Sequence, residues 1–210
     1  MPTASPRSDP PLPPPLLWAD GLVFGHPGVR LFDGLSFEIR PGLSLVQGGD
    51  GRGKTSLMRL MAGQLRPESG CLHCTVERVL HDGVADPADD GVPAATWLAR
   101  RQAAHAGWRP GLATQLIDAF ALAPHLHKSL HMLSTGSRRK LSLVAAAASG
   151  APLTLLDAPH AALDAPSCRV LSALLAEAAH DAQRAWVIAD HESPVGLDGV
   201  GLSTVVDLGD

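Results

Sequence analysis

The chain has 210 residues, of which 45% are hydrophobic, so it can bury a sizeable core in one domain or in one domain with an inserted subdomain. Its 17 basic and 21 acidic residues give a net charge of -4 without a concentrated basic stripe, which argues against a nucleic-acid partner. No apolar run reaches the roughly eighteen residues of a membrane span, and the N-terminus lacks the pattern of a signal peptide. The three cysteines have no framework spacing and favour a reducing cytosol.

Residues 1–17 differ in composition from the rest of the chain and contain the stretch PPLPPPLL. Proline at this density predicts an extended, polyproline-like leader that is disordered. A ligand for an SH3-type domain is the alternative function of such a stretch. The folded part is therefore expected to run from Trp18 to Asp210.

From residue 18 to residue 93 the pattern is that of short strands with one helix. Alternating or apolar runs predict strands at residues 22–24, 35–39, 43–46 and 71–80. Helical spacing of apolar residues predicts a helix over residues 56–65. The Asp-, Gly- and Pro-rich residues 82–93 are expected to form a loop.

The second part of the chain alternates between helices and strands. Amphipathic spacing predicts helices over residues 94–106, 112–122, 137–148 and 166–179. Short apolar runs predict strands over residues 153–156, 185–189 and 203–208. This alternation predicts an α/β fold with a mostly parallel sheet, a small antiparallel β part at the N-terminal end, and an inserted helical subdomain at about residues 94–149.

A glycine-rich stretch, GGDGRGKT at residues 48–55, fits the pattern G-x-x-x-x-G-K-[ST] and lies after a predicted strand and before a predicted helix. Glycines let successive N–H groups point at phosphate oxygens, and the helix adds the positive end of its dipole. Lys54 would reach the β- and γ-phosphates, and Thr55 would place its hydroxyl on Mg²⁺. A glycine-rich turn that matches by chance is the alternative. The expected nucleotide-binding residues are Gly48, Gly49, Asp50, Gly51, Arg52, Gly53, Lys54, Thr55 and Ser56.

A carboxylate that holds Mg²⁺ through water is expected on a neighbouring strand. Asp157 ends the predicted strand at residues 153–156 and is the candidate, with Thr55 as the other metal ligand. Together with the phosphate loop, this aspartate predicts a P-loop NTPase core that takes ATP and Mg²⁺ as its cofactors.

Three further stretches follow in the order that ABC ATPases have. LSTGSRRK at residues 133–140 resembles the LSGGQ-type signature of that family and lies at the start of a predicted helix. ALD at residues 162–164 resembles the D-loop, and His191, just after the strand at residues 185–189, resembles the switch histidine. The chain from Trp18 to Asp210 therefore resembles one ABC-type nucleotide-binding domain with its helical subdomain.

The resemblance implies a head-to-tail dimer in which the signature of each chain serves the nucleotide bound by the other chain. His191 would contact the γ-phosphate as a catalytic residue. His26 takes the place of the aromatic residue that the family stacks on adenine, which an imidazole can also do. Without its context, the signature would suit an ordinary helix capped by a serine. The signature residues expected to contact nucleotide are Ser134, Thr135, Gly136 and Ser137.

Two positions depart from the pattern of the family. Ala158 stands where the family has the glutamate that orients the attacking water, so turnover is expected to be weak. No glutamine lies between Gln64 and Gln102, where the family has its glutamine loop. His81 or Asp82 stands near that place, and neither is a direct replacement.

Other histidines and cysteines are expected to have no metal site or catalytic role. CLHC at residues 71–74 has the spacing of half a zinc site, but no second pair follows and a structural zinc needs four ligands. His125, His127 and His131 precede the signature in a loop, where solvated surface is favoured over a metal site. His160 is expected to be a surface loop histidine.

The sequence thus predicts an ATP-binding subunit of an ABC transporter, cytoplasmic and peripheral on the inner face of the cell membrane. Separate membrane-spanning subunits would supply the pathway, and the chain would form a homodimer or a heterodimer with another ABC ATPase. The alternative is a catalytically weak, nucleotide-gated module that acts in a heterodimer or as a regulator. The expected lack of a regulatory extension after the last strand resembles small stand-alone ATPase subunits, including those of haem-export systems.

Overall fold

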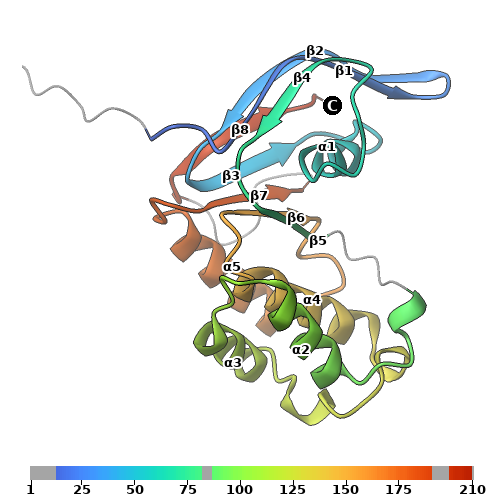
Figure 1. The fold of residues 1–210 in the computed structure, drawn as a ribbon, viewed down its shortest axis with the longest axis vertical. Helices are drawn as coiled ribbons and strands as arrows, with labels where there is room; N and C mark the ends of the chain where they lie inside the picture. Colours follow the sequence, from blue (N-terminus) through green and yellow to red (C-terminus); the bar gives the residue numbers. More distant parts are fainter. Residues whose placement is uncertain (1–12, 82–86, 191–198, 210) are drawn as a thin grey trace, which may run out of the picture.

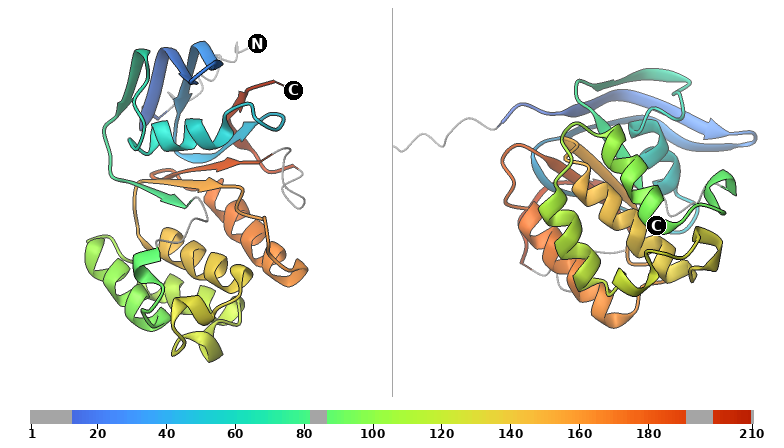
Figure 2. Two further views of the ribbon diagram at one scale, coloured as in Figure 1. Left: turned by 90° about the vertical axis from the view of Figure 1, so that its right-hand side faces the viewer. Right: turned by 60° about the horizontal axis from the view of Figure 1, so that its bottom comes forward.

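The computed structural model describes residues 13–81, 87–190 and 199–209, and these residues form stacked layers. A three-stranded sheet lies at one end, helix α1 (Lys54–Met61) lies beneath it, and a five-stranded sheet follows (Figures 1 and 2). Helices α4 (Thr135–Ala148) and α5 (Ala165–Ala178) lie on the other side of the larger sheet, and α2 (Ala94–Ala104) and α3 (Pro110–Ala119) pack against α4. The predicted α/β fold, with a mostly parallel sheet and a small antiparallel part, is confirmed.

The smaller sheet is antiparallel, in the order β2-β1-β4. β1 (Leu17–His26) and β2 (Val29–Ile39) form one hairpin, and β4 (Ser69–Cys74) pairs with the other side of β1. Both hairpin strands are longer than predicted, because register shifts in β1 interrupt the alternation by which a strand is recognised. Leu17 and Ile39 are fully buried and belong to the same apolar cluster as the buried face of α1.

The single strand predicted at residues 71–80 is wrong, because the chain changes sheets within it. β4 ends at Cys74 in the antiparallel sheet, whereas β5 (Arg78–His81) is the edge strand of the parallel sheet and pairs with β6 (Leu153–Asp157). The residues between the two strands continue the alternation, since Leu72, Cys74 and Val76 are separated by polar neighbours. The hydrophobic pattern therefore does not show where the chain passes from one sheet to the other.

The parallel sheet has the strand order β5-β6-β7-β3-β8, with β3 (Gly42–Gln47), β7 (Ala185–Ala189) and β8 (Leu202–Asp207). Alternate residues of a strand face opposite layers. Trp186 and Ile188 accordingly pack in the cluster that contains α4 and α5, whereas Val187 and Ala189 pack in the cluster that contains α1. Burial on both faces explains why β3, β6 and β7 are mostly apolar in the sequence and do not alternate with exposed polar residues. The order also places β7 between β3 and β6.

The helices begin close to where they were predicted. α1 begins directly after Gly53, and α5 begins after Asp164, whose carboxylate accepts a hydrogen bond from the Ser167 N–H. Pro166 lies in the first turn of α5, where a missing N–H is tolerated. Short 3-10 helices are found at Pro87–Asp89, Ala123–His125 and Leu130–Met132. No helix in the described ranges is long and apolar enough to cross a membrane.

Candidate functional site

The glycine-rich loop, residues 48–53, connects the end of β3 to the start of α1. Gly48 has a φ of +149° and Gly53 a φ of +94°. A Cβ on either residue would come within 2.9 Å of another atom, the carbonyl oxygen of Gly209 in one case and the ring of Phe32 in the other. Both positions therefore need glycine for conformation and for space. The N–H of Gly49 donates to the Gly209 carbonyl at 2.9 Å, which holds the loop against the end of the chain after β8.

Lys54 folds back over this loop. Its Nζ donates to the carbonyl oxygens of Gly48 at 2.6 Å and Gly49 at 2.8 Å. The N-cap of α1 is Gly53, which has no side chain to cap the helix, and the first turn carries no acidic residue. The first N–H groups of α1 have no intrahelical acceptor and the helix end is positive, so an ammonium group and a helix N-terminus converge on a place suited to an anion.

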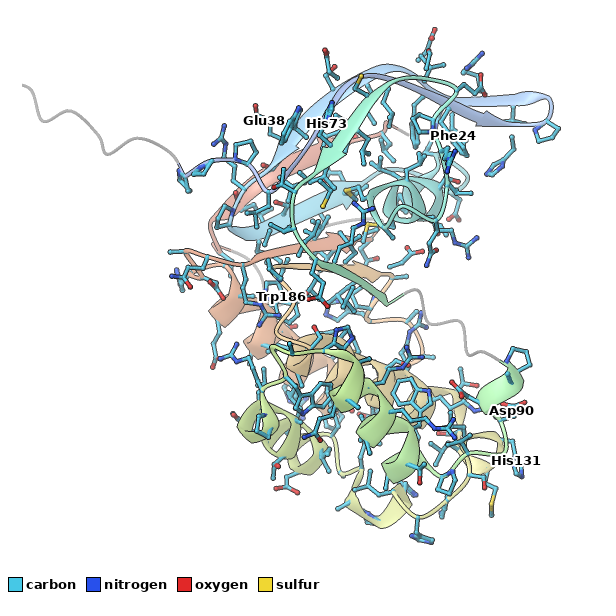
Figure 3. All side chains as sticks on the ribbon, viewed as in Figure 1. Phe24, Glu38, His73, Asp90, His131 and Trp186 are labelled. Atoms are coloured by element: carbon cyan, nitrogen blue, oxygen red, sulfur yellow. The ribbon has the colours of Figure 1, made fainter. Side chains whose placement is uncertain are left out.

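A cleft of about 390 Å³ opens beside the loop, between α1 and the β1–β2 hairpin. His26, at the end of β1, lies on one side of it, and its Nε2 is 3.1 Å from the Oγ of Ser56. The ring of Phe24, labelled on β1 in Figure 3, meets the His26 ring edge-on at 5.3 Å between centroids. Phe24 itself is buried, as expected for a core residue. The cleft is lined by His26, Val29, Leu31, Asp50, Gly51, Gly53, Lys54, Thr55 and Ser56.

The cleft thus brings the predicted base-stacking residue to the predicted phosphate loop. Gly48 and Gly49 shape the start of the loop and receive Lys54, but they do not line the cleft. Arg52 is exposed and also lies outside the lining. Val29 and Leu31 add apolar surface beside His26. The sequence does not predict this role, because strand residues of a hairpin carry no local signal for a ligand.

Asp157 is the last residue of β6, and its exposed fraction is 7%. The carboxyl ends of three strands are joined at this edge, since the Ala158 N–H donates to the Ala189 carbonyl at 2.9 Å and the Asp190 N–H donates to the Val46 carbonyl at 3.1 Å. Asp157 and the glycine-rich loop therefore flank the end of β7, at the edge where open α/β sheets bind ligands.

The donors at this edge suit Mg²⁺ rather than a softer metal. The hydroxyl of Thr55 and the carboxylate of Asp157 are hard oxygen ligands, and Mg²⁺ usually takes one or two of these together with phosphate oxygens and water. Among the residues that the structure describes, no three histidines, cysteines or acidic residues are grouped as a metal cage would need. A site completed by the phosphates of a nucleotide fits this donor set.

Residues 158–164 form a loop that follows β6 and precedes α5. Ala158 has a φ of +43° and Ala162 a φ of +59°, both in the left-handed region that non-glycine residues rarely adopt. Ala158 brings no polar side chain to the edge of the sheet. The loop therefore starts at the candidate metal carboxylate and lacks the second carboxylate that the family pattern predicts.

The signature stretch opens α4. Ser134 is the N-cap, and its Oγ accepts a hydrogen bond from the Ser137 N–H at 3.1 Å while donating to the Ser137 hydroxyl at 3.0 Å. Both Ser134 and Thr135 are exposed. The signature is thus a capped helix start that faces solvent, which is compatible with the capping alternative and with contact to a second chain.

The signature and the loop 158–164 are in contact within one chain, which the sequence does not predict. A Cβ on Gly136 would lie 2.8 Å from the carbonyl oxygen of Ala162. Arg139 Nη1 donates to the Ala161 carbonyl at 2.9 Å, and Lys140 Nζ lies 2.8 Å from the Asp164 carboxylate. Residues 20 or more positions apart make these contacts, so no local pattern predicts them.

His160 does not fit its predicted place as a surface loop residue. Its side chain is only 17% exposed, and its Nδ1 lies 3.6 Å from a carboxylate oxygen of Asp190, just after β7. The chain between β6 and α5 turns this side chain inward over the end of the sheet. His191 and Asp82 lie outside the described residues, and His81 is the last residue of β5.

The other histidine and cysteine clusters do not form metal sites in the described part of the chain. His125 contacts Lys128. The His131 ring contacts the Asp90 carbonyl at 2.9 Å, and both residues lie at the end of the helical part far from the sheets (Figure 3). In β4, His73 stacks on Trp18 at 5.0 Å. Cys71 is exposed, and the Cys74 thiol contacts a backbone carbonyl.

Comparisons with known proteins agree with this arrangement. The family model described as ABC transporter matches residues 32–161, from β2 through the loop after β6. The relatives include proteins named cytochrome c biogenesis ATP-binding export protein CcmA. That from Xylella fastidiosa is 32% identical over 80% of this chain and 83% of its own length, and that from Rhodospirillum rubrum is 36% identical over 80% and 76%. The protein of that name from Rhodopseudomonas palustris is 34% identical over 84% and 92%.

Solved structures share the fold at low sequence identity. A structure described as an ATP-binding subunit of an ABC transporter has a TM-score of 0.70 at 18% identity, with 84% of this chain and 79% of that chain covered. A nucleotide-free ATP-binding cassette from an ABC transporter has a TM-score of 0.67 at 15% identity, with 91% and 88% covered. Sequence and fold agree, and the chain belongs to the ABC transporter family as an ATP-binding ATPase subunit.

Proposed function

We propose that this chain binds ATP with Mg²⁺ in the cleft between the β1–β2 hairpin and the glycine-rich loop, and hydrolyses it slowly to drive an export step in cytochrome c biogenesis. The observation that carries the nucleotide site is the convergence of His26, Lys54 and the uncapped start of α1 on one cleft. The export step is supported by the CcmA proteins, which are 32–36% identical over most of this chain.

Each residue of the site has a role that its position allows. Lys54 leaves the carbonyls of Gly48 and Gly49 and pairs with the β- and γ-phosphates, while the N–H groups of the loop and of α1 hold the phosphate oxygens. Thr55 and Asp157 would hold Mg²⁺, whose charge would offset that of the phosphates. His26 stacks on the adenine. We assign His191 a contact to the γ-phosphate by resemblance.

Slow turnover follows from Ala158. A general base contributes on the order of 100- to 10,000-fold to rate, and this loop supplies no carboxylate at that position. Phosphoryl transfer depends mainly on positioning and on electrostatic stabilisation, which Lys54, Mg²⁺ and the partner's signature still provide. The second candidate function, a nucleotide-gated module with little turnover of its own, is favoured by the same Ala158.

The exposed start of α4 supports a second chain as partner. Ser134 and Thr135 face solvent at a helix N-terminus, where a γ-phosphate held by another chain would be stabilised. We propose a head-to-tail dimer, either a homodimer or a heterodimer with another ABC ATPase. Membrane-spanning subunits provide the path for the exported molecule, and the dimer lies against them on the cytoplasmic face of the membrane.

The test is ATP binding and turnover by the full-length purified chain, with Lys54→Ala as the inactivating change and Lys128→Ala as the matched control in the helical part. We expect Mg²⁺-dependent ATP binding that Lys54→Ala weakens at least tenfold and Lys128→Ala leaves unchanged, because only Lys54 lies in the cleft. Turnover that disappears in Lys54→Ala supports the ATPase, and tight binding without turnover supports the gated module. Absence of ATP binding would contradict both.

A further inference from the structure

His160 and Asp190 join the segments that follow β6 and β7. The Nδ1 of His160 lies 3.6 Å from the Asp190 carboxylate, and the two side chains are 17% and 24% exposed. The N–H of Asp190 donates to the carbonyl of Val46 in β3, the strand that leads into the glycine-rich loop. The pair therefore lies at the edge of the sheet where the nucleotide is expected, directly over the end of β7.

The two nitrogens of the His160 ring are buried in an unusual way, although 17% of the side chain is exposed. Within the described residues, neither ring nitrogen has a hydrogen-bond partner, and neither is open to solvent. A buried polar group without a partner costs about 1–3 kcal/mol, and native proteins rarely keep one without a reason. A phenylalanine of similar size would avoid this cost. Packing alone therefore does not explain a histidine at this position. A state of the chain in which His160 and Asp190 approach to hydrogen-bonding distance does explain it.

The loop that carries His160 also holds the signature helix. Arg139 donates to the Ala161 carbonyl, and Lys140 pairs with Asp164. Contacts thus run from β3 through Asp190 and His160 to the loop, and from the loop to α4. A change at the end of β3, where the glycine-rich loop begins, can reach the start of α4 through these groups.

We infer that His160 is a positioning residue for ATP hydrolysis, acting with Asp190 to fix the loop 158–164 against the end of β7 when nucleotide is bound. The inference rests on the proposed ATPase function and adds a device that the family pattern does not provide. Ala158 has no carboxylate, so the side chain at position 158 cannot bridge to the γ-phosphate and hold the loop in place. The pair of His160 and Asp190 holds the loop in place instead. ATP affinity depends on Lys54 and the cleft, and should not change.

The experiment measures kcat, KM and the ATP dissociation constant for the full-length chain with Mg²⁺. His160→Phe keeps the volume and removes both nitrogens, whereas His160→Asn keeps one N–H donor near the position of Nδ1. His180→Phe, on an exposed histidine at the end of α5, is the matched control. Thermal unfolding of each variant reports whether the fold is intact.

We expect His160→Phe to lower kcat on the order of 10- to 100-fold, the size of effect that a misplaced active-site group can have, with the dissociation constant within about twofold of the original. His160→Asn should recover most of the loss, and His180→Phe should change nothing.

Two results would overturn the inference. If His160→Phe keeps its kcat and unfolds at the same or a higher temperature, the imidazole only fills space. If the original chain binds ATP and does not turn it over, the positioning role falls while the nucleotide-binding function stands. If the original chain does not bind ATP at all, the proposed function itself is rejected. Failure of the positioning role and failure of the proposed function are therefore distinguishable.

Discussion

Lys140 of the signature helix and Asp164 at the start of α5 are held together at 2.8 Å, so two motifs 24 residues apart in the sequence form one contact. Asp164 also caps α5 by accepting the Ser167 N–H at 2.9 Å. The hydrogen bond from Lys140, followed by those from Ser167, holds the pKa of the Asp164 carboxyl well below its ordinary value of 3.8. A lowered pKa in the folded state means that the charged carboxylate stabilises the fold.

The first prediction follows from the sign of this shift. The contribution of Asp164 to stability is fully present above its ordinary pKa and is lost as the pH falls below about 4 toward the lower folded pKa. Asp164→Asn should therefore lower the unfolding temperature at pH 7, and the difference from the original chain should shrink as the pH falls through this range. Unfolding temperatures at pH 7 and at acid pH check the prediction.

Asp118→Asn is the control for this comparison, since Asp118 is an exposed residue near the end of α3. It should leave the unfolding temperature unchanged at both pH values. A loss in Asp164→Asn that stays constant down to low pH would show that the cap, and not the charge, stabilises this helix start.

A second prediction concerns Gly136, where the signature approaches the loop after β6. A Cβ added there would lie 2.8 Å from the Ala162 carbonyl oxygen, closer than real Cβ contacts, so α4 and the loop must move apart. Gly136→Ala should lower both kcat and the unfolding temperature. In α3, the Cβ of Gly111→Ala would meet nothing within 4 Å, and this change should stabilise the helix by up to about 1 kcal/mol.

Kinetics and thermal unfolding of these two alanine variants check the prediction. The same loss of stability in both variants would contradict it, because only Gly136 has a close neighbour. A Gly136→Ala chain with normal kcat and normal stability would show that α4 and the loop can move apart without loss of stability or activity.

The parts of the candidate site that the sequence predicts are local in the chain. The glycine-rich motif is eight consecutive residues, 48–55, that run from the end of a strand into the start of a helix, and its spacing alone indicates where Lys54 and Thr55 stand. The pairs Lys140–Asp164 and His160–Asp190 join residues that are 24 and 30 positions apart. These pairs form because α4 and the end of β7 pack against the loop. The hydrophobic periodicity of the sequence does not predict this packing.

The crossing from β4 to β5 was missed for a related reason. Hydrophobic alternation reports which side of a strand is buried, but it does not report which sheet the strand joins. The inward position of His160 has no local signal either, since a histidine after Pro159 in a loop suits an exposed position equally well. The change of sheet between β4 and β5 and the position of His160 are therefore visible only in the folded structure.

A third prediction addresses Ala158. Ala158→Glu would place a carboxylate beside Asp157, where the family has one, and should raise kcat on the order of 100-fold or more, because a general base typically contributes that much. The positive φ of +43° strains any non-glycine side chain, and alanine already bears that strain, so the fold should tolerate glutamate. Ala158→Gln, which matches the size without the charge, should not raise kcat.

Steady-state ATPase assays on the three chains check this prediction. An equal gain with glutamine would mean that a hydrogen-bonding group is enough to orient the water. No gain with glutamate, with ATP affinity unchanged, would show that the loop does not aim position 158 at the nucleotide.

The last prediction concerns His26 and the base. An aromatic pair contributes about 0.5–1.5 kcal/mol beyond burial, so removing the ring with His26→Ala should weaken ATP binding by roughly 2- to 12-fold. His26→Phe restores a larger apolar face and should bind ATP at least as tightly as the original chain. Ser56→Ala, which removes the hydroxyl 3.1 Å from Nε2, separates the effect of the hydrogen bond from that of the stacking.

Inorganic triphosphate has no base, so its affinity should be the same in the original, His26→Ala and His26→Phe chains. Calorimetric titration with ATP and with triphosphate measures both effects. A loss of triphosphate affinity in His26→Ala would contradict the stacking role, because it would mean that His26 acts on the phosphate loop through Ser56.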